Sequence, residues 1–179
     1  LFPEEEIQVH FSYRIANKGI GYVPERRSIF RYLSVEENLK IAERKKGDYA
    51  RKQEFIFGLF PDLKRLINLS GTNLSGGQQQ MLAIGRALMG NPQFMLLDEP
   101  TAGMSIEEVP AILEIIQRIK ASGTRTILLV EHKFDMIMTV SDSIAVLKDG
   151  RLICDDTPEC VAQNQEVQEA YLGGGVKHD

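Results

Sequence analysis

The stretch "LSGGQQQMLAIGRALMGNPQFMLLDEP", residues 74–100, places a helix directly before a buried strand. Ser75 and Gln78 have the S-x-x-Q spacing of a capping box, which predicts that a helix begins beside the two glycines between them. Gly90, followed by Asn-Pro, marks the end of that helix. The apolar run "FMLLD" then indicates a buried strand that ends in carboxylates. A helix leading into a buried strand is typical of an α/β fold.

Further helices and strands alternate on both sides of this stretch. Upstream, "GIGYV" predicts a short buried strand. Downstream, the expected elements are a helix over about 107–121, a strand over 126–131, a short helix over 133–140, a hairpin over 143–156 turning at Lys148 to Arg151, and a helix over 158–172. Buried strands that alternate with amphipathic helices imply a largely parallel sheet.

Residues 35–73 have a different character and predict a small helical lobe. Ser34 and Glu37 form a second possible capping box, and two helical stretches follow them. The segment before about Lys18 mixes a charged run with an apolar one and favours no element. The predicted organisation is therefore 1–34 as part of the core, 35–73 as the lobe, 74–157 as the α/β core and 158–179 as a terminal helix and tail.

Composition excludes several classes of protein. The net charge of −4 argues against a protein that binds the nucleic-acid backbone through a basic surface. The longest apolar runs fall far short of the roughly 20 residues that span a bilayer, so any membrane role is expected to be peripheral. The two cysteines lack C-x-x-C spacing, which makes a metal site or a disulfide framework improbable and fits a reducing cytosol.

The helix that begins at Gly76 and Gly77 is a candidate phosphate site. Glycines leave backbone N–H groups bare at the positive end of the helix dipole, and Ser75 adds a hydroxyl. The alternative is that the glycines only make a tight turn into the helix.

Two strand ends supply a second set of candidate residues. "FMLLDEP" delivers Asp98 and Glu99 at the carboxyl end of a strand, where α/β sheets place their ligand crevices. A carboxylate there can hold Mg²⁺ beside phosphates, and its neighbour can act as a general base toward water. The alternative is a solvated turn. "LLVEHKF" ends the next strand in Glu131 and His132, from where an imidazole could reach a γ-phosphate.

Together, "LSGGQQQ", "FMLLDEPTAG" and "LLVEH" closely resemble the ATP-binding subunits of ABC transporters. The resemblance implies ATP and Mg²⁺ as ligands. It assigns nucleotide binding to a signature motif, the Mg²⁺ contact to Asp98, general-base catalysis to Glu99 and a switch role to His132. The signature residues are Leu74, Ser75, Gly76, Gly77 and Gln78. In this family two subunits pack head to tail, and each ATP lies between the phosphate loop of one subunit and the signature motif of the other.

The Gly-x-x-x-x-Gly-Lys-Ser/Thr phosphate loop of that family is absent from these 179 residues. The resemblance therefore implies an α/β fold of the P-loop NTPase and ABC ATPase type with a helical subdomain, truncated at its amino terminus. Without the lysine and the backbone cradle for the β- and γ-phosphates, we expect negligible ATP hydrolysis from this chain alone.

Further stretches resemble the subunits that energise branched-chain amino acid uptake. They are "GIGYVPERRSIFRYLSVEENL", "LFPDLKRL" and "EVQEAYLGGG". Most ABC proteins carry a Gln at the position of Glu25, and a Glu after Val-Pro is similar to this subfamily. By that resemblance Glu25 approaches the nucleotide and the Mg²⁺. Ser105 stands where the family has an Asp, and "VEHKFDMIM" is similar to the sister subunit, which leaves open which of the paired subunits this is.

The resemblance also implies the partners and the location. The partners are a second ABC ATPase subunit and transmembrane permease subunits, with no nucleic acid, on the cytoplasmic side of the membrane. Two other hypotheses stay open: a non-transport ABC ATPase, and a truncated, non-catalytic module that pairs with a complete subunit.

Overall fold

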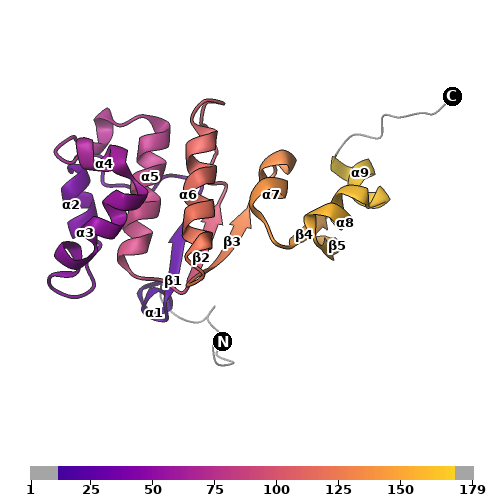
Figure 1. Cartoon of the computed structure of the whole chain (residues 1–179), viewed down its shortest axis with the longest axis horizontal. Coiled ribbons are helices and arrows are strands. Elements are labelled where there is room, and N and C mark those ends of the chain that lie inside the picture. Colours follow the sequence, from indigo (N-terminus) through magenta and orange to yellow (C-terminus); the bar gives the residue numbers. More distant parts are fainter. Residues whose placement is uncertain (1–11, 172–179) are drawn as a thin grey trace. The chain divides into compact units, whose positions relative to one another are not determined.

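The computed structural model describes residues 12–171 (Figure 1). The chain separates into two compact units, Leu1–Val130 and Glu131–Asp179. The functional segments predicted above, with bounds at 34, 73 and 157, remain predictions.

The first unit is built on a parallel sheet of three strands in the order β1-β2-β3. The strands are β1 (Ile20–Val23), β2 (Phe94–Asp98) and β3 (Thr126–Val130). In the register, Tyr22 lies beside Leu96, which lies beside Leu128. The predicted α/β class and the largely parallel core are confirmed.

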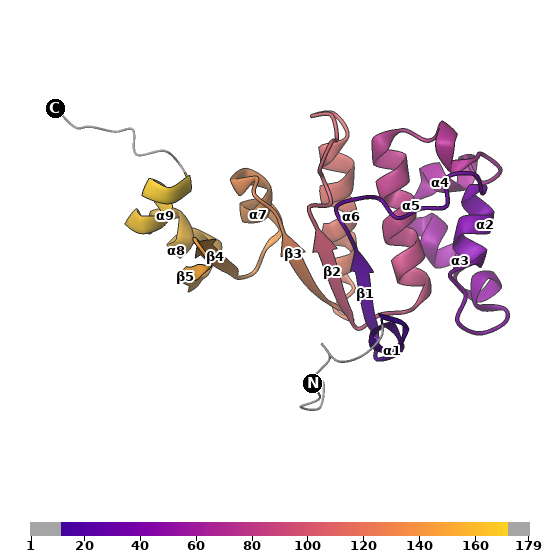
Figure 2. The ribbon, with the colours of Figure 1, turned by 180° about the vertical axis from the view of Figure 1, so that it is seen from behind.

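Two helices, α5 (Gly76–Met89) and α6 (Val109–Ala121), cover one face of this sheet (Figures 1 and 2). Alternate residues on β1 and β2 are buried, among them Met95 and Leu97 on β2. Gly21 permits close approach at this face, because a Cβ there would lie 3.0 Å from the Pro92 ring. Tyr22 and Leu128, on the alternate positions, are exposed.

The helical lobe precedes α5, as predicted. It contains α2 (Val35–Lys40), α3 (Asp48–Leu59), α4 (Pro61–Arg65) and the 3₁₀ turn η2 (Gly71–Asn73). The capping box of Ser34 and Glu37 is present at the start of α2. Both α2 and α3 contact α5, which also contacts β1, so α5 is shared by the lobe and the sheet. A short helix, α1 (Ser12–Asn17), lies just before β1, in the segment for which the sequence favoured no element.

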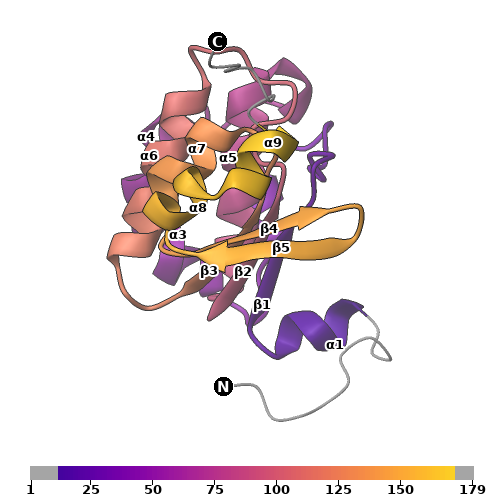
Figure 3. The same cartoon turned by 90° about the vertical axis from the view of Figure 1, so that its right-hand side faces the viewer.

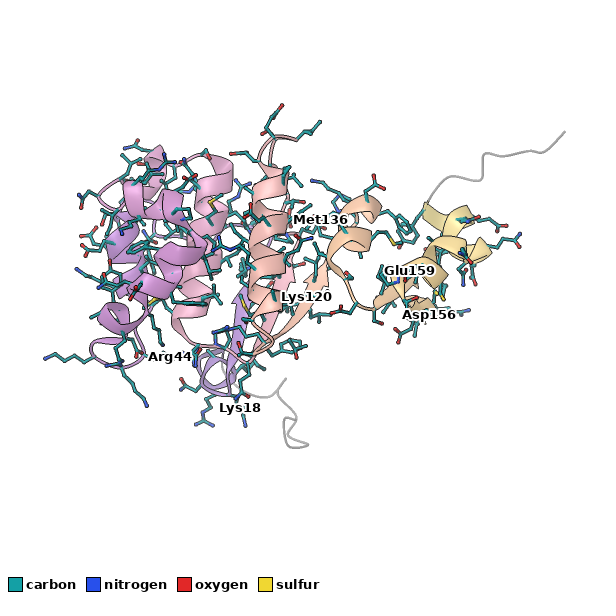
Figure 4. The ribbon with its side chains drawn as sticks, viewed as in Figure 1. Lys18, Arg44, Lys120, Met136, Asp156 and Glu159 are labelled. Carbon is teal, nitrogen blue, oxygen red and sulfur yellow. The ribbon has the colours of Figure 1, made fainter. Side chains whose placement is uncertain are left out.

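The carboxyl end of α5 joins the lobe to the sheet. The helix ends at Met89 as predicted, but Gly90 keeps a right-handed backbone and Asn91 takes the left-handed one, with φ 48°. The Lys52 ammonium donates to the Met89 carbonyl oxygen at 2.6 Å. A Cβ at Gly90 would lie 2.8 Å from the guanidinium of Arg44, which Figure 4 labels at the edge of the lobe. The close neighbour is the end of a flexible side chain, so this contact by itself does not require a glycine.

The second unit contains α7 (Phe134–Val140), the hairpin of β4 (Ile144–Lys148) and β5 (Arg151–Asp156), α8 (Pro158–Gln163) and α9 (Gln165–Tyr171). Figure 3 shows the two antiparallel strands side by side. Asp149 and Gly150 both have positive φ, as a two-residue hairpin turn requires, which confirms the predicted turn. Within residues 12–171, no helix is both long and apolar enough to cross a bilayer.

One prediction about this unit is wrong. The expected single helix over 158–172 is two helices, because Asn164 has an extended backbone between them. Its side-chain oxygen accepts a hydrogen bond from the Val167 N–H at 3.1 Å, so Asn164 caps the start of α9. Leu172 lies outside the described residues.

Candidate functional site

The amino terminus of α5 is the predicted phosphate site, and the structure confirms its local form. The Ser75 hydroxyl accepts from the Gln78 N–H at 3.2 Å, and the Gln78 side chain accepts from the Ser75 N–H at 3.0 Å. Leu74 is buried and anchors the chain before the helix, while Ser75 is exposed. Gly76 and Gly77 form the first turn, where backbone N–H groups have no partner within the helix.

A residue that the sequence did not indicate, Glu108, lies at this helix start. Its Oε1 accepts from the Ser75 hydroxyl at 2.8 Å and from the Gly77 N–H at 3.0 Å, and its Oε2 accepts from the Ser105 N–H at 3.2 Å. The pKa of Glu108 is lowered, first by the Ser75 hydroxyl, then by the two N–H groups, and last by the charge of Arg27. No sequence pattern links positions 75 and 108, because the two residues are far apart in the chain and meet only when it folds.

The carboxyl end of β2 brings Asp98 and Glu99 together, as predicted. Both residues are half-buried. The Tyr22 hydroxyl donates to the Asp98 carboxylate at 3.1 Å. The register explains this contact, since Tyr22 lies beside Leu96, two residues before Asp98 and on the same face of the sheet. Loss of solvent, followed by the hydrogen bond and the charge of Asp98, raises the pKa of the Tyr22 phenol.

Glu99 has an uncommon backbone conformation. Its φ is 44°, in the left-handed region that residues other than glycine seldom adopt. The Glu99 N–H donates to the Val130 carbonyl oxygen at 2.9 Å, and the Glu99 carbonyl oxygen accepts from the Ala102 N–H at 2.9 Å. The first bond continues the pairing of β2 with β3, and the second closes a turn directly after β2. Unfavourable backbone conformations of this kind cluster at active sites.

The loop after β1 carries Glu25 and reaches the other two segments through Arg27. The Arg27 guanidinium donates to the Ala102 carbonyl oxygen at 2.7 Å. A Cβ at Gly76 would lie 3.1 Å from the same guanidinium. Glu25 is exposed and has no hydrogen-bond or ion-pair partner among residues 12–171. The first unit therefore gathers the segment after β1, the start of α5 and the segment after β2 around Arg27.

His132 lies outside the first unit. It belongs to the second unit, where it follows the last residue of β3 by two positions and is exposed. Within the described residues there is no group of three or more His, Cys, Asp or Glu side chains that could hold a metal ion. Asp98 fits Mg²⁺ in a different manner, because this ion is commonly held by one or two carboxylates together with phosphates and water.

Two family models match the chain. Residues 3–102 match the ABC transporter family, and residues 151–177 match the branched-chain amino acid ATP-binding cassette transporter family. The first match covers more than half of the sequence. The chain belongs to the ABC transporter ATP-binding family. It is therefore an ABC-type ATPase subunit, of a family whose members bind and hydrolyse nucleotide.

Individual relatives agree with this assignment. The chain is 41% identical to the high-affinity branched-chain amino acid transport ATP-binding protein BraG of Pseudomonas aeruginosa, over 97% of this chain and 75% of that protein. It is 30% identical to the branched-chain amino acid transport ATP-binding protein BraF of the same organism, over 94% of this chain and 73% of that protein. The lipopolysaccharide export ATP-binding protein LptB of Escherichia coli is 33% identical, over 97% and 73%.

Solved structures show the same fold. A nucleotide-free ATP-binding cassette from an ABC transporter superposes with a TM-score of 0.76 and 26% identity, over 89% of this chain and 71% of that chain. An ATP-binding cassette in its ADP conformation superposes with a TM-score of 0.75 and 25% identity, over 89% of this chain and 70% of that chain.

Proposed function

We propose that this chain is the ATPase subunit of a branched-chain amino acid importer and works on the cytoplasmic face of the membrane against permease subunits. The observation that carries the choice of transporter is the match of residues 151–177 to the branched-chain family. That region lies outside the nucleotide motifs, so it supports the substrate class independently of the ATPase chemistry. The similarity to BraG supports the same choice.

Nucleotide would be shared between two subunits packed head to tail. Ser75 and Gly77 offer an exposed hydroxyl and a backbone N–H at the start of a 14-residue helix, which suits the terminal phosphate of a nucleotide held by the second subunit. Leu74, Gly76 and Gln78 hold these donors in place through burial, close backbone approach and the capping box.

Asp98 would hold Mg²⁺ through water, and the Tyr22 hydroxyl would keep its carboxylate oriented. Bound Mg²⁺ would neutralise charge on the phosphates. Glu25 would join it only when the metal is present, because a carboxylate near phosphate is repelled unless a cation lies between them. Its exposed position, with no partner among residues 12–171, leaves it available for this role.

Glu99 would act as the general base that takes a proton from the attacking water. The left-handed turn at Glu99 and its two backbone hydrogen bonds fix the start of this side chain at the sheet edge. His132 would contact the terminal phosphate as the switch residue, a role that rests on its place after β3 and on the family resemblance.

The permease would contact the first unit beside the loop after β1. A cavity of about 210 Å³ lies there between this loop and α5. The Arg86 guanidinium donates to the Ser28 carbonyl oxygen and lies 4.7 Å from the centre of the half-exposed Phe30 ring. The residues that line the cavity are Tyr22, Val23, Pro24, Ser28, Ala42, Ala83, Arg86 and Ala87.

Uptake of radiolabelled leucine, in the host strain with this gene deleted, tests the proposal. Expression of the native protein should restore uptake, and Glu99→Gln should not, since an amide cannot accept the proton. Glu114→Gln is the matched control, because Glu114 is an exposed carboxylate on α6. Leucine uptake that is unaffected by the deletion, or fully restored by Glu99→Gln, would contradict the proposed function.

A further inference from the structure

The Glu108 carboxylate occupies the position at the start of α5 to which Ser75 and Gly77 donate. A single oxygen, Oε1, accepts from both donors, at 2.8 and 3.0 Å. Glu108 is the residue before α6, so this contact joins two segments that are far apart in the sequence. The position therefore already holds an anion that belongs to the chain itself.

The shape of the helix start matches this occupant. A Cβ at Gly77 would lie 3.0 Å from Glu108 Oε1 and 3.2 Å from its Cδ. Gly77 is buried, so the carboxylate rests against the backbone where a side chain would otherwise stand. The Ser105 N–H holds the second oxygen at 3.2 Å. Three donors from two segments thus hold one carboxylate.

These are the donors through which the proposed function places the terminal phosphate of a nucleotide. A phosphate oxygen and Glu108 Oε1 cannot fill the same space, and their negative charges repel each other. We infer that Glu108 takes part in ATP binding as a competitor of the nucleotide. Its carboxylate occupies the Ser75 and Gly77 donors at the start of α5, and the terminal phosphate replaces it when a second subunit presents nucleotide. This inference rests on the proposed function.

Arg27 offers the displaced carboxylate a new partner. Its guanidinium lies beside Gly76 and donates to the Ala102 carbonyl oxygen at 2.7 Å. Because nucleotide must displace a bound anion, Glu108 raises the ATP concentration at which two subunits associate. A purely structural role, in which Glu108 only braces the start of α5, has the opposite consequence: its removal would weaken association.

Glu108→Gln tests the difference in sign. Glutamine keeps the shape and an acceptor oxygen for Ser75 and Gly77, but it lacks the charge that makes the carboxylate a strong competitor. Association of the native subunits is followed by light scattering as ATP is added. We expect Glu108→Gln to lower the ATP concentration at half-maximal association by roughly 3- to 10-fold. Glu107→Gln is the matched control, because Glu107 is the adjacent, exposed carboxylate, and its midpoint should stay within about twofold.

An unchanged or higher midpoint for Glu108→Gln, at an unchanged melting temperature, would overturn the inference. A second measurement keeps the test valid if Glu108→Gln is poorly folded. In the 179-residue chain, titration with inorganic phosphate should shift the Gly77 amide resonance in Glu108→Ala and leave it nearly still in wild type. Equal shifts in both proteins would show that Glu108 does not hold the position.

The two proposals fail in different ways. If ATP drives no association of wild type or of any variant, the proposed function is at fault, and the phosphate titration still decides whether Glu108 occupies the helix start. If ATP drives association normally and both measurements show no effect of Glu108, the inference fails while the proposed function stands.

Discussion

Asp48 shows at the scale of one residue how a carboxylate is held by its surroundings. It is the first residue of α3 and is buried. The Lys45 N–H at 2.9 Å and the Arg51 guanidinium at 2.6 Å donate to its two oxygens. These hydrogen bonds, with lesser help from the nearby Lys52 ammonium, lower the pKa of Asp48 from 3.8 to about 2.

This lowered pKa predicts a pH dependence of stability. A group whose pKa is lower in the folded state stabilises the fold above its unfolded pKa, and that contribution is lost as pH falls. For Asp48 the window runs from about pH 4 down to about pH 2. We expect urea denaturation midpoints of wild type to fall more steeply across this window than those of Asp48→Asn. Parallel profiles of the two proteins would contradict this prediction.

A second prediction at this scale concerns Glu25. Because its carboxylate needs a cation to lie close to phosphate, Glu25→Gln should weaken the Mg²⁺ dependence of ATP hydrolysis. Metal-free ATP binding should stay unchanged or become slightly tighter, since one repulsive charge is removed. The check is a Mg²⁺ titration of ATPase rate and of nucleotide affinity in the native protein. Superimposable curves for the two versions would remove Glu25 from the site.

At the scale of an element, α2 is tied to the loop before it by one buried amide. Asn38 has 0% of its surface exposed. Its side-chain oxygen accepts from the Phe30 N–H at 2.8 Å, and its NH₂ group donates to the carbonyl oxygens of Phe30, Leu33 and Ser34. One side chain on α2 thus fixes the path of the loop that follows Glu25.

Removal of this amide should destabilise the first unit. Asn38→Ala leaves the Phe30 N–H without its acceptor and empties the buried space of the amide, which costs roughly 1 to 3 kcal/mol of unfolding free energy. The carbonyl oxygens of Phe30, Leu33 and Ser34 keep their backbone donors. Urea denaturation measures the loss. Gln117→Ala is the control, since Gln117 is an exposed amide on α6, and its cost should stay within about 0.5 kcal/mol. A cost for Asn38→Ala as small as that of the control would show that water replaces the lost hydrogen bonds.

At the scale of the whole molecule, the proposed cycle requires two subunits to close on nucleotide and to separate after hydrolysis. Glu99→Gln removes the general base but keeps the size of the side chain, so closure should still occur while hydrolysis nearly stops. We expect size-exclusion chromatography with ATP to show a persistent dimer for this variant of the native protein and a transient one for wild type. A variant that stays monomeric at saturating ATP, while wild type dimerises, would exclude Glu99 as the base.

The sequence by itself determined the elements that local chemistry specifies. Apolar runs predicted β1, β2 and β3, and the S-x-x-Q and S-x-x-E spacings predicted the starts of α5 and α2. The Asp149-Gly150 turn was predicted from two residues that tolerate positive φ. Each of these signals acts within a few residues of the chain, which is why it can be read without a structure.

Tertiary structure alone decided which distant groups meet. Tyr22 reaches Asp98 because the parallel register sets their strands on a common face, and Glu108 reaches Ser75 because α5 and α6 pack on one side of the sheet. The break at Asn164 is instead a local feature that the sequence analysis missed, because its side-chain oxygen caps the next helix through the Val167 N–H, only three residues further on. The contacts of Tyr22 and Glu108 depend on folding that brings together segments far apart in the chain, and such contacts leave no periodic trace in the sequence.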